Sequence, residues 1–370
     1  MKSAARFIYL IIYMLVLACS SGQRGDGAGN LMEYSSFLML NEGTDTEVTL
    51  SNPWKEGQIL QGYRLTGEST HGYRYVPGRI NQMHVPLKRI VVMTNSVARL
   101  VDELGMVHAI VGVCDAPYIR DPEVVSRISD GSIVDCGDGM NPDVEKIIDL
   151  QPDAIFVSPF ENAGYGQLEK IGVPLIECAE YMETSPLGRA EWMRFYGRLL
   201  GAGEKADSMF AAVRDSYLAL KARTATSTVR PSVMVDTRSG SAWYIPGGNS
   251  TIGQMISDAG GDYQFSYLEN SGSIPLAFET VYDKALDSDI WLLKSRSGQD
   301  LTYSLLKSDF DGYSGFRPFQ TRNVWVCNVD SVPYFEMSSF HPDLLLEDMM
   351  SIFHPELGTG GHMFYSPMRE

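Results

Sequence analysis

The sequence predicts an α/β protein in which two lobes, each a parallel sheet wrapped by helices, are joined by a single long α-helix. Short apolar runs alternate with stretches of helical periodicity over residues 88–202 and again over 225–370, as is typical of parallel sheets covered by helices. Residues 203–224 carry one apolar stripe, which predicts a rod of about 30 Å. Residues 31–87 alternate apolar and polar positions instead, and this pattern predicts an antiparallel N-terminal β extension of three or four strands.

The first 18 residues differ from the rest of the chain in their pattern of charged and apolar residues. A basic start precedes an apolar run from Phe7 to Leu17, which is typical of a secretory signal and too short for a membrane span. The stretch Val16-Leu17-Ala18-Cys19 resembles the bacterial lipobox, in which the cysteine is acylated and becomes the new N-terminus. We therefore expect a signal peptide over 1–18, lipidation at Cys19 and a flexible Gly- and Ser-rich tether over 19–30. Plain secretion with an incidental cysteine is the alternative.

In the N-terminal lobe, apolar runs and helical spacing alternate regularly. Ser96 is placed to cap the first helix and Gly105 to end it. The expected strands are 89–93, 109–113, 133–134, 153–157 and 174–176, and the expected helices are 97–105, 141–150 and 167–171.

The helical pattern of residues 186–223 is interrupted near Gly201-Ala202-Gly203, and the helix that follows is the expected connection between the lobes. The same alternation restarts after Arg230-Pro231. In the C-terminal lobe the expected strands are 232–236, 290–293 and 324–328, and the expected helices are 250–259, 278–286 and 342–353.

Composition excludes several classes of protein. The 370 residues include 30 Lys and Arg against 46 Asp and Glu, and a formal charge of −16 argues against nucleic-acid binding, which needs clustered basic residues. Four cysteines remain after Cys19, and without a CxxC pair they give no support to a structural zinc site. Because three disulfide pairings are possible in an oxidising compartment, the pairing stays open, and buried free thiols are the default expectation for Cys114, Cys136, Cys178 and Cys327.

Motifs for catalysis are not found, and binding has better support. The sequence has no GxSxG, HExxH or phosphate-loop pattern, and its six histidines are scattered, so we expect neither an enzyme nor a metal site nor a cofactor. Ligands of α/β sheets lie beyond the carboxyl ends of the strands. Residues with aromatic, amide or cationic side chains at these ends are the candidate ligand contacts: Asn95, Tyr118, Phe160, Arg238, Trp243, Tyr244, Lys294, Arg296 and Tyr334. Together they suggest a cleft for a flat or bulky anion, since arginine offers fixed donors and a stacking plane.

Four segments carry a resemblance to a known family. They are Lys88–Val92, Leu104-Gly105 followed by Ile110–Val113, Gly139–Asp153, with its Leu-x-Pro-Asp before a strand, and Ile252–Gly261. These segments resemble the bacterial substrate-binding proteins for ferric siderophores, haem and vitamin B12. The resemblance covers about residues 88–355, whereas 31–87 departs from the usual pattern.

The resemblance implies two Rossmann-like lobes on one helical backbone, with a ligand held between them and delivered to an ABC importer. By motif position, Glu145 and Glu279 would be the glutamates that meet arginines of the permease dimer. Their alternative role is that of acids favoured at the starts of helices. The implied location is the bacterial cell envelope, with a lipid anchor in the membrane and the lobes facing the periplasm.

The cationic residues favour one ligand class over its relatives. Arg238, Lys294 and Arg296 at cleft positions favour a ferric siderophore, with cobalamin or haem as the alternatives. The tryptophan that the family carries before the Gly-Met-Asn turn is absent at Cys136-Gly137, which weakens a cobalamin assignment. Two alternative functions belong to other classes of protein: a surface-anchored interaction module that uses residues 31–87, and an exported hydrolase.

Overall fold

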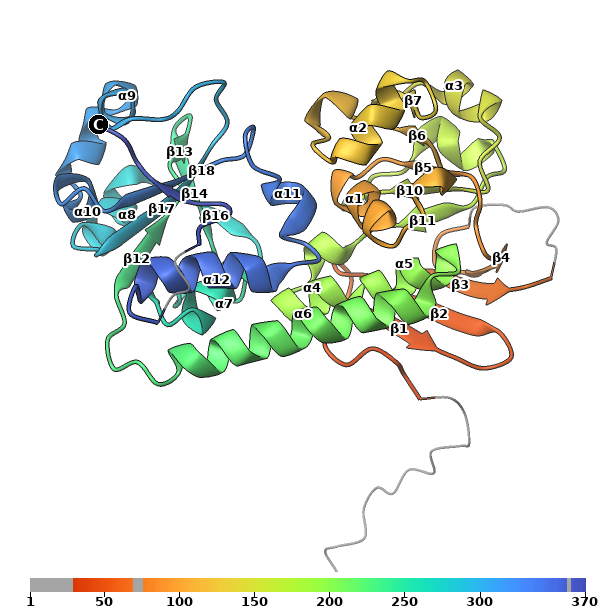
Figure 1. Ribbon diagram of the computed structural model, residues 1–370, viewed down its shortest axis with the longest axis horizontal. Coiled ribbons are helices and arrows are strands. Elements are labelled where there is room, and N and C mark those ends of the chain that lie inside the picture. The colour runs from red at the N-terminus through yellow and green to blue at the C-terminus, as the bar shows by residue number, and fades with distance from the viewer. Residues whose placement is uncertain (1–28, 69–75, 358–360) are drawn as a thin grey trace, which may run out of the picture.

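The computed structural model describes residues 29–68, 76–357 and 361–370. Two α/β lobes lie side by side above one long helix, α6 (Gly203–Thr224), and a small β-sheet lies beside the N-terminal lobe (Figure 1). The predicted signal peptide, the lipidation site Cys19 and nearly all of the predicted tether lie outside the described residues.

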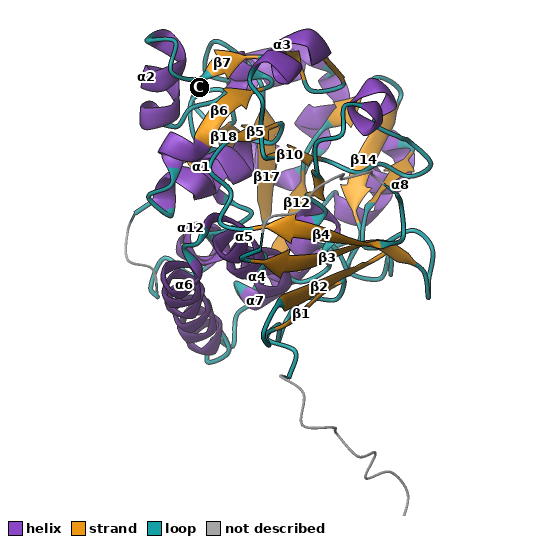
Figure 2. Cartoon of the chain, turned by 90° about the vertical axis from the view of Figure 1, so that its right-hand side faces the viewer, coloured by secondary structure: helices purple, strands orange, loops and turns teal. Residues whose placement is uncertain are grey.

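The β extension is one four-stranded sheet, seen at the edge of the molecule in Figure 2. Its strands lie in sequence order: β1 (Leu38–Asn41), β2 (Thr46–Ser51), β3 (Ile59–Thr66) and β4 (Ile80–His84). The first three are antiparallel as predicted, but β4 runs parallel to β3, which corrects the expectation of a wholly antiparallel sheet. The connection over 67–79 is long enough for a parallel crossover, whereas a tight hairpin would have forced antiparallel pairing.

Two buried carboxylates attach the β extension to the body of the protein. The Glu191 carboxylate accepts the backbone N–H groups of residues 33–35 at 2.8–3.0 Å. Glu183 accepts those of Ser36 and Phe37 and the indole N–H of Trp192. A Cβ at Gly188 would lie 2.7 Å from the carbonyl oxygen of Tyr34, so this position has room only for glycine. The loop over 33–37 is therefore clamped onto the segment that connects the lobes.

The N-terminal lobe has a five-stranded parallel sheet in the order β11-β10-β5-β6-β7. Its strands are β5 (Ile90–Val92), β6 (Ile110–Val113), β7 (Val134–Asp135), β10 (Ala154–Val157) and β11 (Leu175–Glu177). Its helices are α1 (Asn95–Glu103), α2 (Pro122–Ser129) and α3 (Val144–Asp149), and the last predicted helix is a 3₁₀ turn over Gly166–Lys170.

Two helix starts in this lobe differ from the prediction. Helix α3 begins later than expected because Asp143 caps it, while Asn141–Pro142 forms a small hairpin, β9, with β8 (Gly137–Asp138). Ser96 does not cap α1; its hydroxyl donates to Glu180, and the capping position is Thr94.

Helices α4 (Pro186–Glu191), α5 (Met193–Leu200) and α6 connect the lobes. The predicted interruption is at Gly201, whose φ of 73° ends α5. Along α6, Phe210 and Val213 belong to the core of the N-terminal lobe, and Tyr217 and Leu220 to that of the C-terminal lobe. One apolar stripe therefore serves both cores, which explains how a single helix joins the two lobes.

The C-terminal lobe has a second five-stranded sheet in the order β15-β12-β17-β18-β19, parallel except for β19. These strands are β12 (Ser232–Val235), β15 (Asp262–Tyr263), β17 (Ile290–Ser295), β18 (Val324–Asn328) and β19 (Ser366–Pro367). A smaller antiparallel sheet adds β13 (Arg238–Ser239), β14 (Ala242–Pro246) and β16 (Ser273–Leu276). The helices are α7 (Thr251–Asp258), α8 (Phe278–Ala285), α9 (Tyr303–Asp309), α10 (Arg317–Gln320), α11 (Tyr334–Met337) and α12 (Pro342–Phe353).

Candidate ligand-binding site

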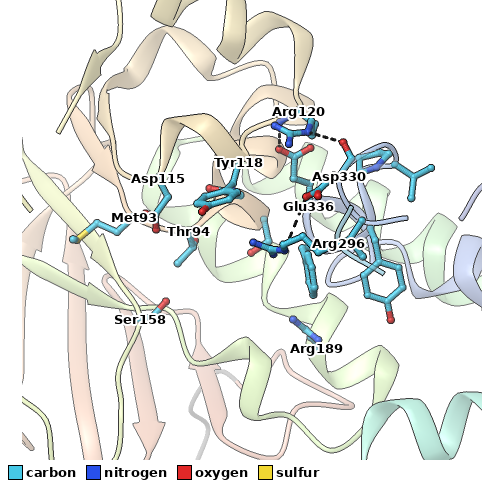
Figure 3. Close-up of a pocket in the computed structure, with 17 residues that line it drawn as sticks. Met93, Thr94, Asp115, Tyr118, Arg120, Ser158, Arg189, Arg296, Asp330 and Glu336 are labelled. Carbon is cyan, nitrogen blue, oxygen red and sulfur yellow. Dashed lines mark hydrogen bonds and ion pairs between the residues drawn. The ribbon is translucent and has the colours of Figure 1, made fainter. Parts of the chain in front are cut away.

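A cleft of about 340 Å³ lies between the lobes (Figure 3). The N-terminal lobe lines it with residues 93–96 and with Asp115, Tyr118, Arg120 and Ser158, which follow β5, β6 and β10 at their carboxyl ends. The C-terminal lobe contributes Arg296 and the stretch around α11, and α4 contributes Arg189. Both sheets therefore deliver their strand ends to one interlobe space, as expected for ligand sites of α/β proteins.

Arg189 lines this cleft together with the carboxylates of Asp115, Asp330 and Glu336. Its Nε is shielded from solvent and has no hydrogen-bond partner among the described residues. Burial lowers the pKa of the guanidinium, and the attraction of Glu180 only partly opposes this effect. Because a shielded guanidinium N–H without a hydrogen-bond partner is costly, an anionic group in the cleft would be favoured at this position.

The N-terminus of α1 faces the same cleft. Helix α1 has no side-chain cap hydrogen bond and no acidic residue in its first turn, and Thr94 and Asn95 line the cleft there. The buried hydroxyl of Thr94 has no hydrogen-bond partner in the described structure. The exposed N–H groups and partial positive charge of a helix start favour an anionic group. Arg189 and α1 thus favour the same sign of ligand charge from two elements.

Unlike the Nε of Arg189, the guanidinium groups of Arg120 and Arg296 have contacts with the other lobe. The Arg120 guanidinium donates to the carbonyl oxygens of Pro117 and, across the lobes, Asp330. Arg296 lies 5.1 Å from the ring centroid of Tyr118, so a cation of one lobe stacks on an aromatic ring of the other. Arg120 therefore ties the lobes together, whereas the half-exposed Arg296 and Tyr118 remain accessible to a ligand.

A second tie between the lobes lies behind α1. Nε2 of His341, at the start of α12, lies 2.7 Å from Oε2 of Glu103, the last residue of α1. Arg99 holds the other oxygen of Glu103 at 2.8 Å and also pairs with Asp121. The lobes are thus joined on this side by a hydrogen-bonded network as well as by α6.

A neighbouring pocket of about 400 Å³ extends the cleft into the C-terminal lobe and shares Arg189 and Tyr334 with it. Lys294 and Tyr244 line this pocket. Burial alone would lower the pKa of Lys294, but the Asp236 carboxylate, 2.8 Å from the ammonium, raises it above its ordinary value. Lys294 is therefore charged and already neutralised, in contrast to Arg189.

The structure brings together seven of the nine residues predicted as ligand contacts. Asn95, Tyr118, Arg296 and Tyr334 line the central cleft, Tyr244 and Lys294 line the neighbouring pocket of the C-terminal lobe, and Phe160 lines a pocket of the N-terminal lobe. Glu145 and Glu279 lie elsewhere, exposed in the first turns of α3 and α8.

Two of the nine are corrected. Trp243 is fully buried, donates its indole N–H to the carbonyl oxygen of Val235 and packs on Trp291. Arg238 lies over the ring of Phe310, 4.1 Å from its centroid, and donates to the carbonyl oxygen of Gly240. Neither side chain lines the cleft or the pockets beside it.

Arg189, Arg120 and Thr94 are among the cleft residues that were not predicted as ligand contacts, and so are the acidic residues Asp115, Asp330 and Glu336. Thr94 stands directly beside the predicted Asn95, so its place at a strand end was available from the sequence. Arg189 had no such signal, because it lies within a stretch with a continuous helical pattern, and only the packing of α4 between the lobes turns it into the cleft.

Metal and thiol chemistry have little support in this site. No group of three or more His, Cys, Asp or Glu within residues 29–68, 76–357 and 361–370 is placed to hold a metal ion. Cys114, Cys136, Cys178 and Cys327 are buried free thiols, as expected. Burial raises the pKa of Cys114 to about 12 and that of Cys136 to about 11, so both are unreactive thiols at neutral pH.

A family model described as a periplasmic binding protein matches residues 90–329, well over half of the chain. The chain belongs to the periplasmic binding protein family. Members of this family are solute-binding proteins, and the predicted membership is confirmed by this match. The matched residues run from β5 to just past β18, so the β extension lies outside them.

Relatives and solved structures agree with this assignment. An uncharacterized lipoprotein of Methanocaldococcus jannaschii is 28% identical over 75% of this chain and 68% of its own length. A petrobactin-binding protein of Bacillus subtilis is 28% identical over 26% of this chain and 31% of its own.

A periplasmic heme-binding protein of Pseudomonas aeruginosa has the same fold, with a TM-score of 0.61 and 17% identity over 77% of this chain and 99% of that one. An Fe3+-hydroxamate transport protein of Saccharomonospora viridis has a TM-score of 0.57 and 18% identity over 73% and 94%. In the part of the chain that the structure describes, none of the helices has the length and apolar character needed to cross a membrane.

Proposed function

We propose that this protein is the substrate-binding lipoprotein of an ABC importer and captures an anionic iron complex, a ferric siderophore, in the cleft between its lobes. The observation that carries the proposal is Arg189, whose Nε is shielded from solvent without a hydrogen-bond partner among the described residues and which lies in a cleft that the N-terminus of α1 also lines. Both features favour a ligand with negative charge. Tyr118, Arg296 and Tyr334 add aromatic and cationic surface from both lobes.

The size of the site supports a bulky chelate over a bare metal ion. The cleft and its two neighbouring pockets, of about 340, 400 and 400 Å³, share lining residues and so lie side by side as one trough-like site. A bulky chelate fits such a trough better than a bare ion would. Haem and cobalamin are the alternative ligands, and a relative and two fold neighbours named for petrobactin, Fe3+-hydroxamate and heme support an iron complex as the ligand class.

The anchor and the permease complete the proposed function. Acylation at Cys19 would hold the protein at the cell-envelope membrane, which accords with relatives that are named lipoproteins. Glu145 and Glu279 are exposed on different lobes, where two carboxylates can set the register of docking onto the permease.

Native mass spectrometry of the mature protein with a panel of ligands tests the proposal. The panel contains an anionic ferric tris-catecholate, a neutral ferric tris-hydroxamate, haem and cobalamin. We expect a one-to-one complex with the anionic chelate. Binding of cobalamin or haem alone would replace the ligand assignment, and binding of none of the four would contradict the transport function.

A further inference from the structure

The trough does not end at the arginines. A pocket of about 400 Å³ in the N-terminal lobe opens from the central cleft, with which it shares Met93, Asp115 and Ser158. Its walls are the β8–β9 hairpin with the start of α3 on one side and the loop over 158–168 after β10 on the other. We call it the apolar compartment and define it by Met93, Met140, Val144, Val157, Phe160 and Leu168.

The chemistry changes sharply between the central cleft and the apolar compartment. Arg120, Arg189 and Arg296 line the cleft together with the carboxylates of Asp115, Asp330 and Glu336. No lysine or arginine is among the residues that line the compartment, whose polar side chains include Asn141, Tyr165 and Gln167. Its one acidic residue, Asp115, accepts the backbone N–H of Gly139. The Cβ of any other residue at 139 would lie 2.8 Å from Oδ2 of Asp115, so this carboxylate shapes the hairpin that forms the wall.

Large apolar side chains are left uncovered at this compartment. Met140 is 75% exposed and Phe160 is 47% exposed, each at the tip of a loop that faces the pocket. Exposed apolar residues that gather around a concave site mark a binding surface. Methionine suits such a surface because its flexible thioether adapts to ligands of irregular shape.

We propose that the apolar compartment binds an apolar arm, such as an acyl chain, of the same ligand whose anionic metal centre lies against Arg189. This inference rests on the proposed function and extends it: the substrate class is an amphipathic anionic chelate. Continuity with the cleft fixes the geometry, since an arm attached to the metal centre passes Met93 and Ser158 to reach Met140 and Phe160. The apolar arm removes these side chains from water when it binds.

Calorimetric titration with two matched probes tests this proposal: a ferric tris-catecholate and the same complex carrying one octyl chain. The wild-type protein is expected to bind the octyl complex at least tenfold more tightly. In the double variant Met140→Ser/Phe160→Ser, the preference for the octyl complex falls below threefold. Both positions are exposed, so the fold tolerates the change. Met39→Ser, an exposed apolar position on the β extension, is the matched control and keeps the wild-type preference.

The outcomes distinguish failure of the apolar compartment from failure of the proposed function. Equal affinity of the wild type for both probes, or a preference that survives in the double variant, overturns the apolar compartment but leaves the proposed function standing. If the double variant loses uptake and yet keeps the preference, the exposed pair is a contact with the permease and the inference is wrong. Failure of the wild type to bind either probe defeats the proposed function and this inference with it.

Discussion

Among single residues, Arg189 combines burial with the lack of a hydrogen-bond partner for its Nε in the described structure. Replacing it by methionine removes a shielded N–H without a partner while keeping much of the volume. We expect Arg189→Met to raise the free energy of unfolding by about 1 kcal/mol or more. The same change should weaken binding of a ferric tris-catecholate at least tenfold, about 1.4 kcal/mol. Urea denaturation and calorimetric titration measure the two effects.

A matched control for this variant is Arg194→Met. Arg194 pairs with Asp207 at 2.8 Å and donates to the carbonyl oxygen of Leu31, so its charge is compensated and lies away from the cleft. We expect this variant to lose stability and to keep its affinity, the reverse of Arg189→Met. An Arg189 variant that binds as tightly as the wild type would contradict the assigned role of this residue.

At the scale of elements, the clamp between the 33–37 loop and α4 holds the β extension in place. Glu191→Ala leaves the backbone N–H groups of Glu33, Tyr34 and Ser35 without their acceptor. We expect the free energy of unfolding to fall by about 2–3 kcal/mol, since these are hydrogen bonds to a buried charge. Hydrogen–deuterium exchange should become faster at residues 33–37. Glu269→Ala, at an exposed carboxylate of the C-terminal lobe, should change neither quantity; unchanged exchange in Glu191→Ala would refute the clamp.

The network between α1 and the start of α12 predicts a pH dependence. Burial alone would raise the pKa of Glu103, but hydrogen bonds from His341 and Arg99 outweigh it and bring the pKa below its ordinary value of 4.5. The carboxylate therefore adds stability that is complete above pH 4.5 and is lost as the pH falls through the lowered pKa.

Glu103→Gln should lower the free energy of unfolding by about 1–3 kcal/mol at pH 7. The difference from the wild type should shrink in urea titrations carried out below pH 4.5. Glu123→Gln breaks a surface pair with Arg127 and should cost less than about 0.5 kcal/mol. A difference for Glu103→Gln that grows on acidification would show that this carboxylate does not hold the lobes together.

For the whole molecule, docking and ligand capture are expected to be separable. Glu145 and Glu279 are exposed and line neither the cleft nor the pockets beside it. Glu145→Ala/Glu279→Ala should reduce uptake of the iron complex in cells by at least tenfold, because register on the permease is lost. Its affinity for the ligand in solution should stay unchanged. Lost affinity would show that these carboxylates belong to the binding site instead.

Helices and strands could be predicted from the sequence where the spacing of apolar residues was regular over the whole element. The bounds of α6, α12 and β18 match the prediction because each carries an unbroken apolar pattern. The direction of strand pairing could not be predicted from periodicity. Residues 80–84 have the alternating pattern of a strand, but their parallel pairing with β3 depends on the path of the connection between the two strands.

The candidate site was predictable in position but not in orientation. Trp243 and Tyr244 are neighbours on β14, so their side chains point to opposite faces, and only Tyr244 reaches the pocket. A strand end alone does not tell which face is buried. Arg189 was missed because its role arises from the packing of α4 between two lobes that are far apart in the sequence.

The central claim is that the interlobe cleft selects an anionic iron complex. Calorimetric titration of the mature protein with a ferric tris-catecholate and with a neutral ferric tris-hydroxamate of similar size tests it most directly. We expect one binding site and at least tenfold tighter binding of the anionic complex, because Arg189 and the N-terminus of α1 receive its charge. Equal or tighter binding of the neutral complex would contradict it.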